Sequence, residues 1–91
     1  MLDLKKIYII NENIVLRKID NKFWALNIEN GNQYRLNDVS YFILELLRKA
    51  HTFEEIILSI EKEYMVERNQ LIEDCSLMIQ TAIDKNILKE V

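Results

Sequence analysis

The chain contains no proline and a single glycine, Gly31. Linkers between domains are usually rich in such residues, so nothing marks a boundary along the 91 residues. We therefore expect one domain spanning residues 1–91, with a modest core because a short chain buries a limited share of its surface. A lone glycine also excludes a glycine-rich loop that binds phosphate.

Cysteine and histidine are equally scarce, with one of each, Cys75 and His51. A single thiol cannot form an internal disulfide or a multi-thiolate metal site, which favours a reducing compartment. The apolar runs are too short for a signal peptide or a membrane span, so we expect a cytoplasmic protein without membrane contact. His51 is interpreted as a loop histidine, and Cys75 as a small buried hydrophobe within an apolar helical stripe. We expect no catalytic residue, no metal and no cofactor.

Positive charge does not dominate either, because 12 Lys and Arg residues face 15 Asp and Glu residues and the net charge is -3. Proteins that bind the phosphate backbone need clustered cations, so we expect no nucleic acid partner. The acidic residues Glu54, Glu55, Glu61 and Glu63 are interpreted as the solvated face of a helix. Their spacing does not bring two carboxylates into one cleft, as catalysis would require.

Residues 14–36 show the pattern of a three-stranded antiparallel meander. Its strands are predicted at "IVLRKI" (14–19), "KFWALNI" (22–28) and Gln33–Leu36. The second strand alternates at Trp24, Leu26 and Ile28, and Trp24 is interpreted as a core residue. The joints Asp20-Asn21 and Asn30-Gly31 fit turns that need positive φ.

Apolar spacing then changes to a helical period and predicts three helices. Asn37 or Asp38 caps the first, Thr52 and Glu55 form a capping box for the second, and the third begins near Glu67. The predicted apolar stripes are Val39, Phe42, Ile43, Leu46 and Leu47; Phe53, Ile56, Ile57, Ile60 and Tyr64; and Leu71, Ile72, Cys75, Met78, Ile79, Ala82 and Ile83.

Asn86 is predicted as a left-handed cap of the third helix, followed by a short terminal strand in "ILKEV". Residues 1–12 are the least readable part of the sequence, and no element is predicted there. The expected fold class is α+β and winged helix-turn-helix-like, a three-stranded antiparallel β-meander followed by three α-helices.

Two features remain outside this packing scheme. Leu77 falls off the apolar stripe of the third helix and lies beside Gln70, Asp74 and Thr81. The strand Gln33–Leu36 can pair with the second strand on one side only, unless the terminal segment or another chain covers its other edge. A free edge of this kind is either an aggregation hazard or a binding site.

This arrangement resembles the PqqD-like family, whose members are also called RiPP recognition elements, over about residues 14–91. The matching features are Gly31, "YRLN" (34–37), "FILELL" (42–47), Thr52 with Glu55 and Ile56, Tyr64, and Asp74 followed by Cys75, Met78, Ile79, Ala82 and Leu88. The chain departs from the family pattern at Asn86, where glycine is usual, at Lys49-Ala50, where Asp-Gly is usual, and at Met78, where an aromatic residue is usual.

The resemblance implies a domain that binds the leader segment of a ribosomally made precursor peptide and delivers it to a modifying enzyme. The leader would add as a strand to Gln33–Leu36 and rest against the third helix. The peptide-binding residues expected on this basis are Gln33, Tyr34, Arg35, Leu36, Gln70, Asp74, Leu77, Met78 and Thr81.

The function expected from the sequence is therefore non-catalytic recognition of a precursor peptide. The length of the chain suggests that its enzyme partner is either the leader peptidase of a lasso-peptide system or a radical SAM maturase. Two alternatives remain, a winged-helix DNA-binding regulator and a structural dimerisation module that pairs through the same strand edge. We expect a monomer or a weak homodimer.

Overall fold

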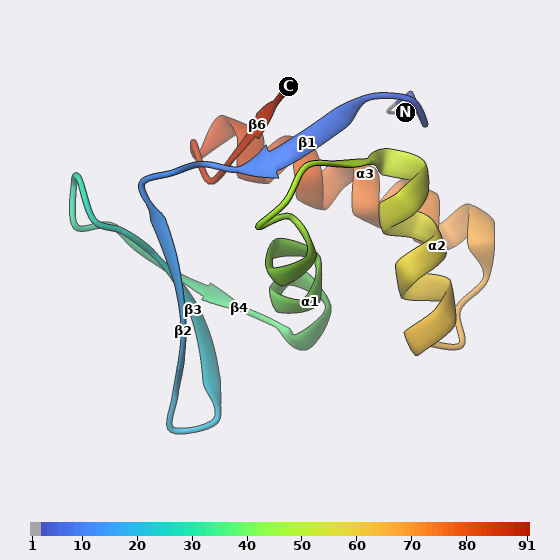
Figure 1. Cartoon of the computed structure of the whole chain (residues 1–91). Helices are drawn as coiled ribbons and strands as arrows, with labels where there is room; N and C mark the ends of the chain where they lie inside the picture. The colour runs from blue at the N-terminus through green and yellow to red at the C-terminus, as the bar shows by residue number, and fades with distance from the viewer. Residues whose placement is uncertain (1–2) are drawn as a thin grey trace.

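The computed structural model describes residues 3–91. Figure 1 shows the strands of the meander on one side of the molecule and the helices on the other. The elements follow in the order β1 (Ile7–Ile10), β2 (Ile14–Ile19), β3 (Lys22–Asn27), β4 (Gln33–Leu36), α1 (Asp38–Leu46), β5 (His51–Thr52), α2 (Phe53–Glu63), α3 (Arg68–Asp84) and β6 (Leu88–Glu90).

The predicted meander is confirmed as an antiparallel sheet in the order β2-β3-β4. Asp20 and Asn21 at the first joint have φ angles of 52° and 64°, and Gly31 at the second has 78°. These left-handed conformations suit aspartate, asparagine and glycine, so the joints form where the residue types predict them. β4 lies at the edge of the sheet, and its outer side has no partner strand among residues 3–91.

The interpretation of Trp24 as a core residue is wrong. Ala25 is fully buried, whereas Trp24 is only partly buried and Ile28 is 68% exposed. Trp24 pairs with Arg17 on β2 and Arg35 on β4, so it lies on the outer face of the sheet. The inner face packs against α1, where the small Ala25 allows close approach. The larger Trp24 ring lies on the outer face, because successive side chains of a strand alternate between its two faces.

A second sheet, in the order β5-β1-β6, lies outside the predicted scheme. β1 occupies part of the N-terminal segment, for which no element was predicted, and it pairs with the predicted terminal strand, β6. Because β6 pairs with β1, it leaves the outer edge of β4 uncovered. The winged helix-turn-helix description is thus approximate, although the α+β class and the meander before three helices are confirmed.

The helix ends follow the predicted chemistry. The side chain of Asn37 caps α1 by accepting a hydrogen bond from the Ser40 amide at 2.8 Å. Thr52 and Glu55 form the capping box of α2. Glu67 caps α3, and Asn86 adopts the left-handed conformation with φ of 60°. These local interactions satisfy backbone groups that a helix leaves unpaired at its ends.

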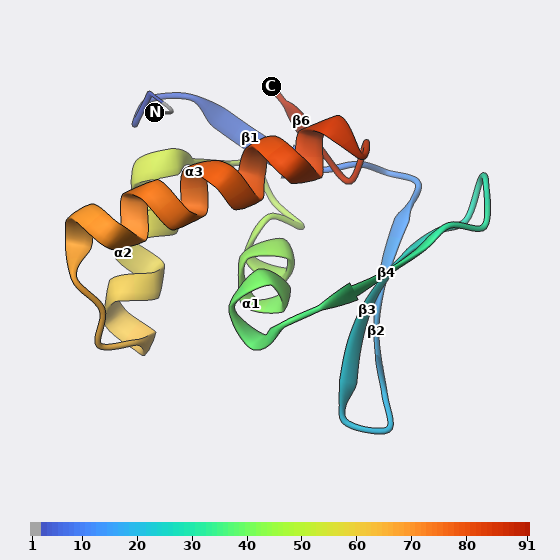
Figure 2. The same cartoon turned by 180° about the vertical axis from the view of Figure 1, so that it is seen from behind.

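The core forms where α1, α2 and α3 pack against one another and against both sheets. Figures 1 and 2 show α1 between the meander and the pair of longer helices, with α3 running across the molecule toward β6. Leu44 of α1 is fully buried although it lies outside the predicted stripe of this helix, because α1 is covered on more than one side. Within residues 3–91, the structure contains no helix long and apolar enough to cross a membrane.

Candidate functional site

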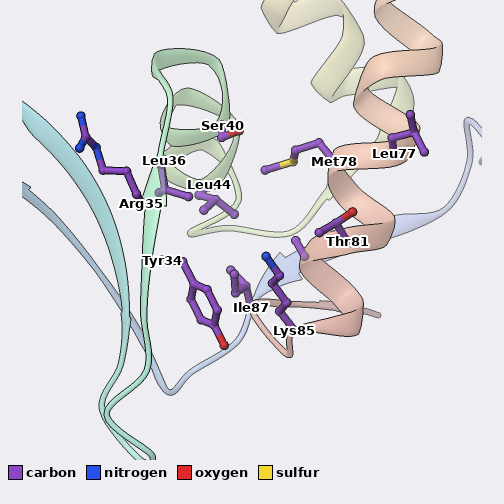
Figure 3. Close-up of a pocket in the computed structure, with 11 residues that line it drawn as sticks. Tyr34, Arg35, Leu36, Ser40, Leu44, Leu77, Met78, Thr81, Lys85 and Ile87 are labelled. Carbon is purple, nitrogen blue, oxygen red and sulfur yellow. The ribbon is translucent and has the colours of Figure 1, made fainter.

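A groove of about 350 Å³ lies between β4 and the C-terminal half of α3 (Figure 3). Leu44 of α1 and Ile87, just after α3, are buried side chains that contribute to its apolar lining. The residues that line this β4–α3 groove are Tyr34, Arg35, Leu36, Ser40, Leu44, Leu77, Met78, Thr81, Ala82, Lys85 and Ile87. The mixture of apolar floor and polar margins is typical of sites that bind an organic ligand or a peptide.

The strand edge beside the groove has unpaired backbone groups in a defined order. The Asn27 amide donates to the Asn32 carbonyl at 2.8 Å, which makes these two residues a hydrogen-bonded pair. Such pairs alternate along an antiparallel ladder. Tyr34, opposite Ala25, therefore bonds to β3, whereas Gln33 and Arg35 direct their backbone N–H and C=O groups toward the free edge.

Two cations lie at the groove, and each contacts an aromatic ring. The Lys85 ammonium lies 5.4 Å from the centre of the Tyr34 ring, and the Arg35 guanidinium lies 5.8 Å from the centre of the Trp24 ring. Such contacts restrict a flexible cationic side chain while leaving its hydrogen-bond donors accessible. Figure 3 shows Lys85 directed toward the groove and Arg35 extending away from it, at its margin.

Six of the expected peptide-binding residues line the groove: Tyr34, Arg35, Leu36, Leu77, Met78 and Thr81. Leu77 is 66% exposed, as its position off the apolar stripe predicts. Three expected residues do not line it. Gln33 is exposed on the outer face of β4, and Gln70 donates a hydrogen bond to Asp74 at 2.9 Å on α3.

Asp74 lines a neighbouring hollow of about 360 Å³ instead. Ser40 and Met78 line both the hollow and the β4–α3 groove, so the two depressions meet at these side chains. Tyr64 and Val66 line the part of the hollow nearer to the joint between α2 and α3. A bound chain that follows α3 could therefore extend from the groove toward Asp74.

Five lining residues were not expected from the sequence: Ser40, Leu44, Ala82, Lys85 and Ile87. Ala82 did carry a signal, but it indicated the core, since Ala82 lies on the apolar stripe of α3. Lys85 follows Thr81 by one helical turn, so a search at helical spacing from Leu77 and Thr81 would have found it. Ser40, Leu44 and Ile87 reach the groove only through tertiary packing.

Chemically reactive groups are poorly placed for catalysis in the described part of the chain. Burial raises the pKa of the Cys75 thiol to about 11, so the nucleophilic thiolate is scarce at neutral pH. His51 Nδ1 lies 3.6 Å from a carboxylate oxygen of Glu55 at the start of α2, away from the groove. Within residues 3–91, no three His, Cys, Asp or Glu side chains group as metal ligands would.

Comparisons with known proteins show which folds this chain resembles. The chain matches two solved structures along nearly their whole length. One, TbiB1 in complex with the TbiA(beta) leader peptide, shares 27% identity with a TM-score of 0.78, over 89% of this chain and 94% of that chain. The other, lasso peptide synthetase B1 complexed with its leader peptide, has 20% identity and a TM-score of 0.77, over 90% of this chain and 96% of that one, and so indicates a shared fold.

A search of curated proteins gives no significant match. The family model for Coenzyme PQQ synthesis protein D (PqqD), in contrast, matches residues 24–88. This range includes most of β3, all of β4 and all three helices, and therefore both walls of the groove. It confirms the resemblance inferred from the sequence. Since the match spans well over half of the 91 residues, the chain belongs to the PqqD family.

Proposed function

We propose that this protein binds the leader segment of a ribosomally synthesised precursor peptide in the β4–α3 groove. The leader adds to the outer edge of β4 as a further antiparallel or parallel strand, and its side chains on one face enter the groove. Main-chain hydrogen bonds supply affinity that does not depend on sequence, and the groove selects side chains. The protein itself carries out no chemical step.

The observation that carries this proposal is the position of an unpaired strand edge next to an open, mostly apolar groove. Gln33 and Arg35 offer backbone donors and acceptors, and Leu36, Leu44 and Met78 offer apolar surface beside them. An exposed edge without such a role would risk uncontrolled pairing with other chains. The matched structure at 27% identity is itself a complex with a leader peptide, which supports the same ligand class here.

The proposal extends to a partner enzyme. A binding domain without a catalytic group acts on its ligand only by presenting it, so the bound precursor must be passed to a separate modifying enzyme. We propose a lasso-type leader peptidase as that enzyme, with a radical SAM maturase as the alternative. The name of one matched structure, a lasso peptide synthetase B1, supports the lasso branch of this proposal. The proposal includes a cytoplasmic location, because precursor peptides are made in the cytoplasm.

Fluorescence anisotropy tests the ligand class. The probes are fluorescein-labelled peptides covering about the first thirty residues of each short reading frame beside this gene. We expect one of them to bind with a Kd in the micromolar range or below, equivalent to about -8 kcal/mol or stronger. If none binds while the protein forms a stable dimer in sedimentation experiments, the dimerisation alternative replaces our proposal.

Backbone amide exchange tests the mode of binding. In the free protein the Tyr34 amide is protected by its bond to β3, whereas the Gln33 and Arg35 amides face solvent. Strand addition should slow exchange at Gln33 and Arg35 when the peptide is added and leave Tyr34 nearly unchanged. Slower exchange along α3 without any change at β4 would show that the peptide binds by another mode.

A further inference from the structure

The β4–α3 groove has a charge opposite to that of the protein as a whole. The chain carries a net charge of -3, yet the residues that line the groove include two cations, Arg35 and Lys85, and no carboxylate. Asp74 lies in the neighbouring hollow and accepts a hydrogen bond from Gln70. A cationic groove on an acidic protein indicates selection for an acidic ligand.

Neither groove cation forms an ion pair within the described residues. The ion pairs formed among residues 3–91 involve Lys6, Arg48, His51 and Arg68, and none includes Arg35 or Lys85. On its far side, Arg35 borders a shallow hollow that contains one acid and one base, Asp38 and Lys22, so this hollow adds no net charge. Both groove cations therefore keep donors available for a ligand.

The two cations lie on opposite faces of the sheet to which a strand added at β4 would belong. Arg35 lies in a row across the outer face of the sheet, next to Trp24 and Arg17. Tyr34, the neighbour of Arg35 in the sequence, faces inward, and the Lys85 ammonium lies over its ring. A guest residue beside Arg35 thus points to the outer face, and a guest residue beside Tyr34 points toward Lys85.

We infer that the peptide recognised by this protein is an acidic strand with one carboxylate on each face. One Asp or Glu lies beside Arg35 on the outer face, and another lies in the groove within reach of Lys85. Because side chains alternate between faces, the two acidic positions are an odd number of residues apart. The inference rests on the proposed strand addition and deepens it by defining the ligand's charge pattern.

The expected preference for acidic residues follows from the energetics of side-chain pairs on neighbouring strands. Opposite charges on neighbouring strands stabilise pairing, and like charges directly beside each other oppose it. On the outer face the pair is formed with Arg35 alone, since Arg17 lies on β2, two strands away from Arg35 and beyond Trp24. The contacts with Trp24 and Tyr34 restrict the cations before binding, so less side-chain entropy is lost when the pair forms.

Peptide display tests this charge pattern directly. The probe is a phage-displayed library of random peptides about ten residues long, enough for one strand. It is selected against the wild type, Arg35→Glu, Lys85→Glu and the control Lys62→Glu. Lys62 is also exposed, but it lies near the end of α2 and outside the groove. Circular dichroism melting confirms that each variant is folded, and Arg35→Gln and Lys85→Gln serve as milder substitutes.

We expect the wild type and Lys62→Glu to enrich Asp or Glu at two positions an odd number of residues apart. Arg35→Glu should lose the preference at one of them and Lys85→Glu at the other. For a single selected peptide, each reversal should raise Kd about two- to fivefold, and added salt should weaken binding to the wild type most.

The outcomes separate this inference from the proposed function. The enriched peptides could bind the wild type, fail to bind Leu77→Asp and show no acidic preference. That result would overturn the charge pattern but would remain consistent with strand addition. An acidic preference that survives both Arg35→Glu and Lys85→Glu would also overturn it. If no peptide is enriched on the folded wild type, the inference and the proposed function both fail.

Discussion

The Asn27 amide donates a hydrogen bond to the Asn32 carbonyl at 2.8 Å, and this bond determines which backbone donors of β4 face the free edge. By alternation, Tyr34 bonds inward to β3, and Gln33 and Arg35 face outward. The edge proposed to bind the leader thus offers donors from two residues separated by one that supports the sheet.

Proline substitutions distinguish these two roles, because proline removes one backbone donor and leaves its neighbours intact. Gln33→Pro and Arg35→Pro should unfold cooperatively, close to the wild-type midpoint, but bind the leader weakly. Tyr34→Pro should lose stability, since it removes a bond to β3. Urea unfolding and anisotropy measure the two effects. Normal leader binding by all three variants would place the peptide elsewhere.

Leu77 should matter for binding and not for folding. It is 66% exposed at the margin of the groove, so Leu77→Asp removes apolar contact area without opening the core. We expect leader binding to weaken by about 1–3 kcal/mol with little change in the free energy of unfolding. Leu58→Asp is the matched control, because Leu58 is 51% exposed on α2 and lies outside the groove. Equal loss of binding in both variants would contradict a role for this surface.

Cys75 should react slowly with thiol reagents, because the thiol is buried and its pKa is raised to about 11. Iodoacetamide at neutral pH should modify the native protein far more slowly than the urea-unfolded protein. Cys75→Ala should cost about 1–2 kcal/mol of stability through the cavity it leaves. Neither Cys75→Ala nor His51→Ala should prevent precursor processing in the complete system. Loss of processing in a folded His51→Ala variant would indicate a chemical role.

Acidification should destabilise the protein through the cap of α3. The Glu67 carboxylate accepts hydrogen bonds from the amides of Gln70 and Asn69 at 2.8 and 3.0 Å, and these bonds lower its pKa below the ordinary value of 4.5. Because the pKa of Glu67 is lower in the folded state, the stabilisation is complete above the ordinary pKa of 4.5. It is lost as the pH falls through the lower pKa of the folded state.

Urea unfolding of Glu67→Gln measures this contribution. The variant should be less stable than the wild type at pH 7, and the difference should shrink progressively below about pH 4.5. Glu73→Gln is the control, since Glu73 is exposed in the middle of the same helix. A constant difference between wild type and Glu67→Gln from pH 7 to pH 3 would show that the charge of Glu67 is not responsible.

Duplex DNA should bind weakly and without sequence preference. The exposed positions of α3 are mostly acidic or neutral, and Arg68 at its start is paired with Glu61 at 2.6 Å. A helix with this surface offers few cations to phosphates, which supply most of the affinity for duplex DNA. Electrophoretic mobility shifts at physiological salt provide the measurement. Nanomolar binding to a defined sequence would favour the winged-helix regulator instead.

Local features of this protein could be predicted because they depend on residues close together in the sequence. The strands, the positive φ angles at Asn21 and Gly31, and the cap formed by Asn37 follow from turn chemistry and periodicity. The exposure of Leu77 follows in the same way, from its angle relative to the apolar stripe of α3. Each needs only the intrinsic geometry of one strand or one helix.

Tertiary structure decided which surfaces these elements share. Trp24 lies on the outer face because α1 packs against Ala25, and alternation alone cannot tell the two faces of a strand apart. β1 became a strand by pairing with β6 from the far end of the chain, which no local pattern encodes. Lys85 entered the groove only when the end of α3 came to lie over Tyr34. The sequence by itself thus determined the strands of the meander, the three helices and their caps. Packing between distant segments determined the second sheet and the charge and floor of the groove, because contacts between residues far apart in the chain depend on the whole fold.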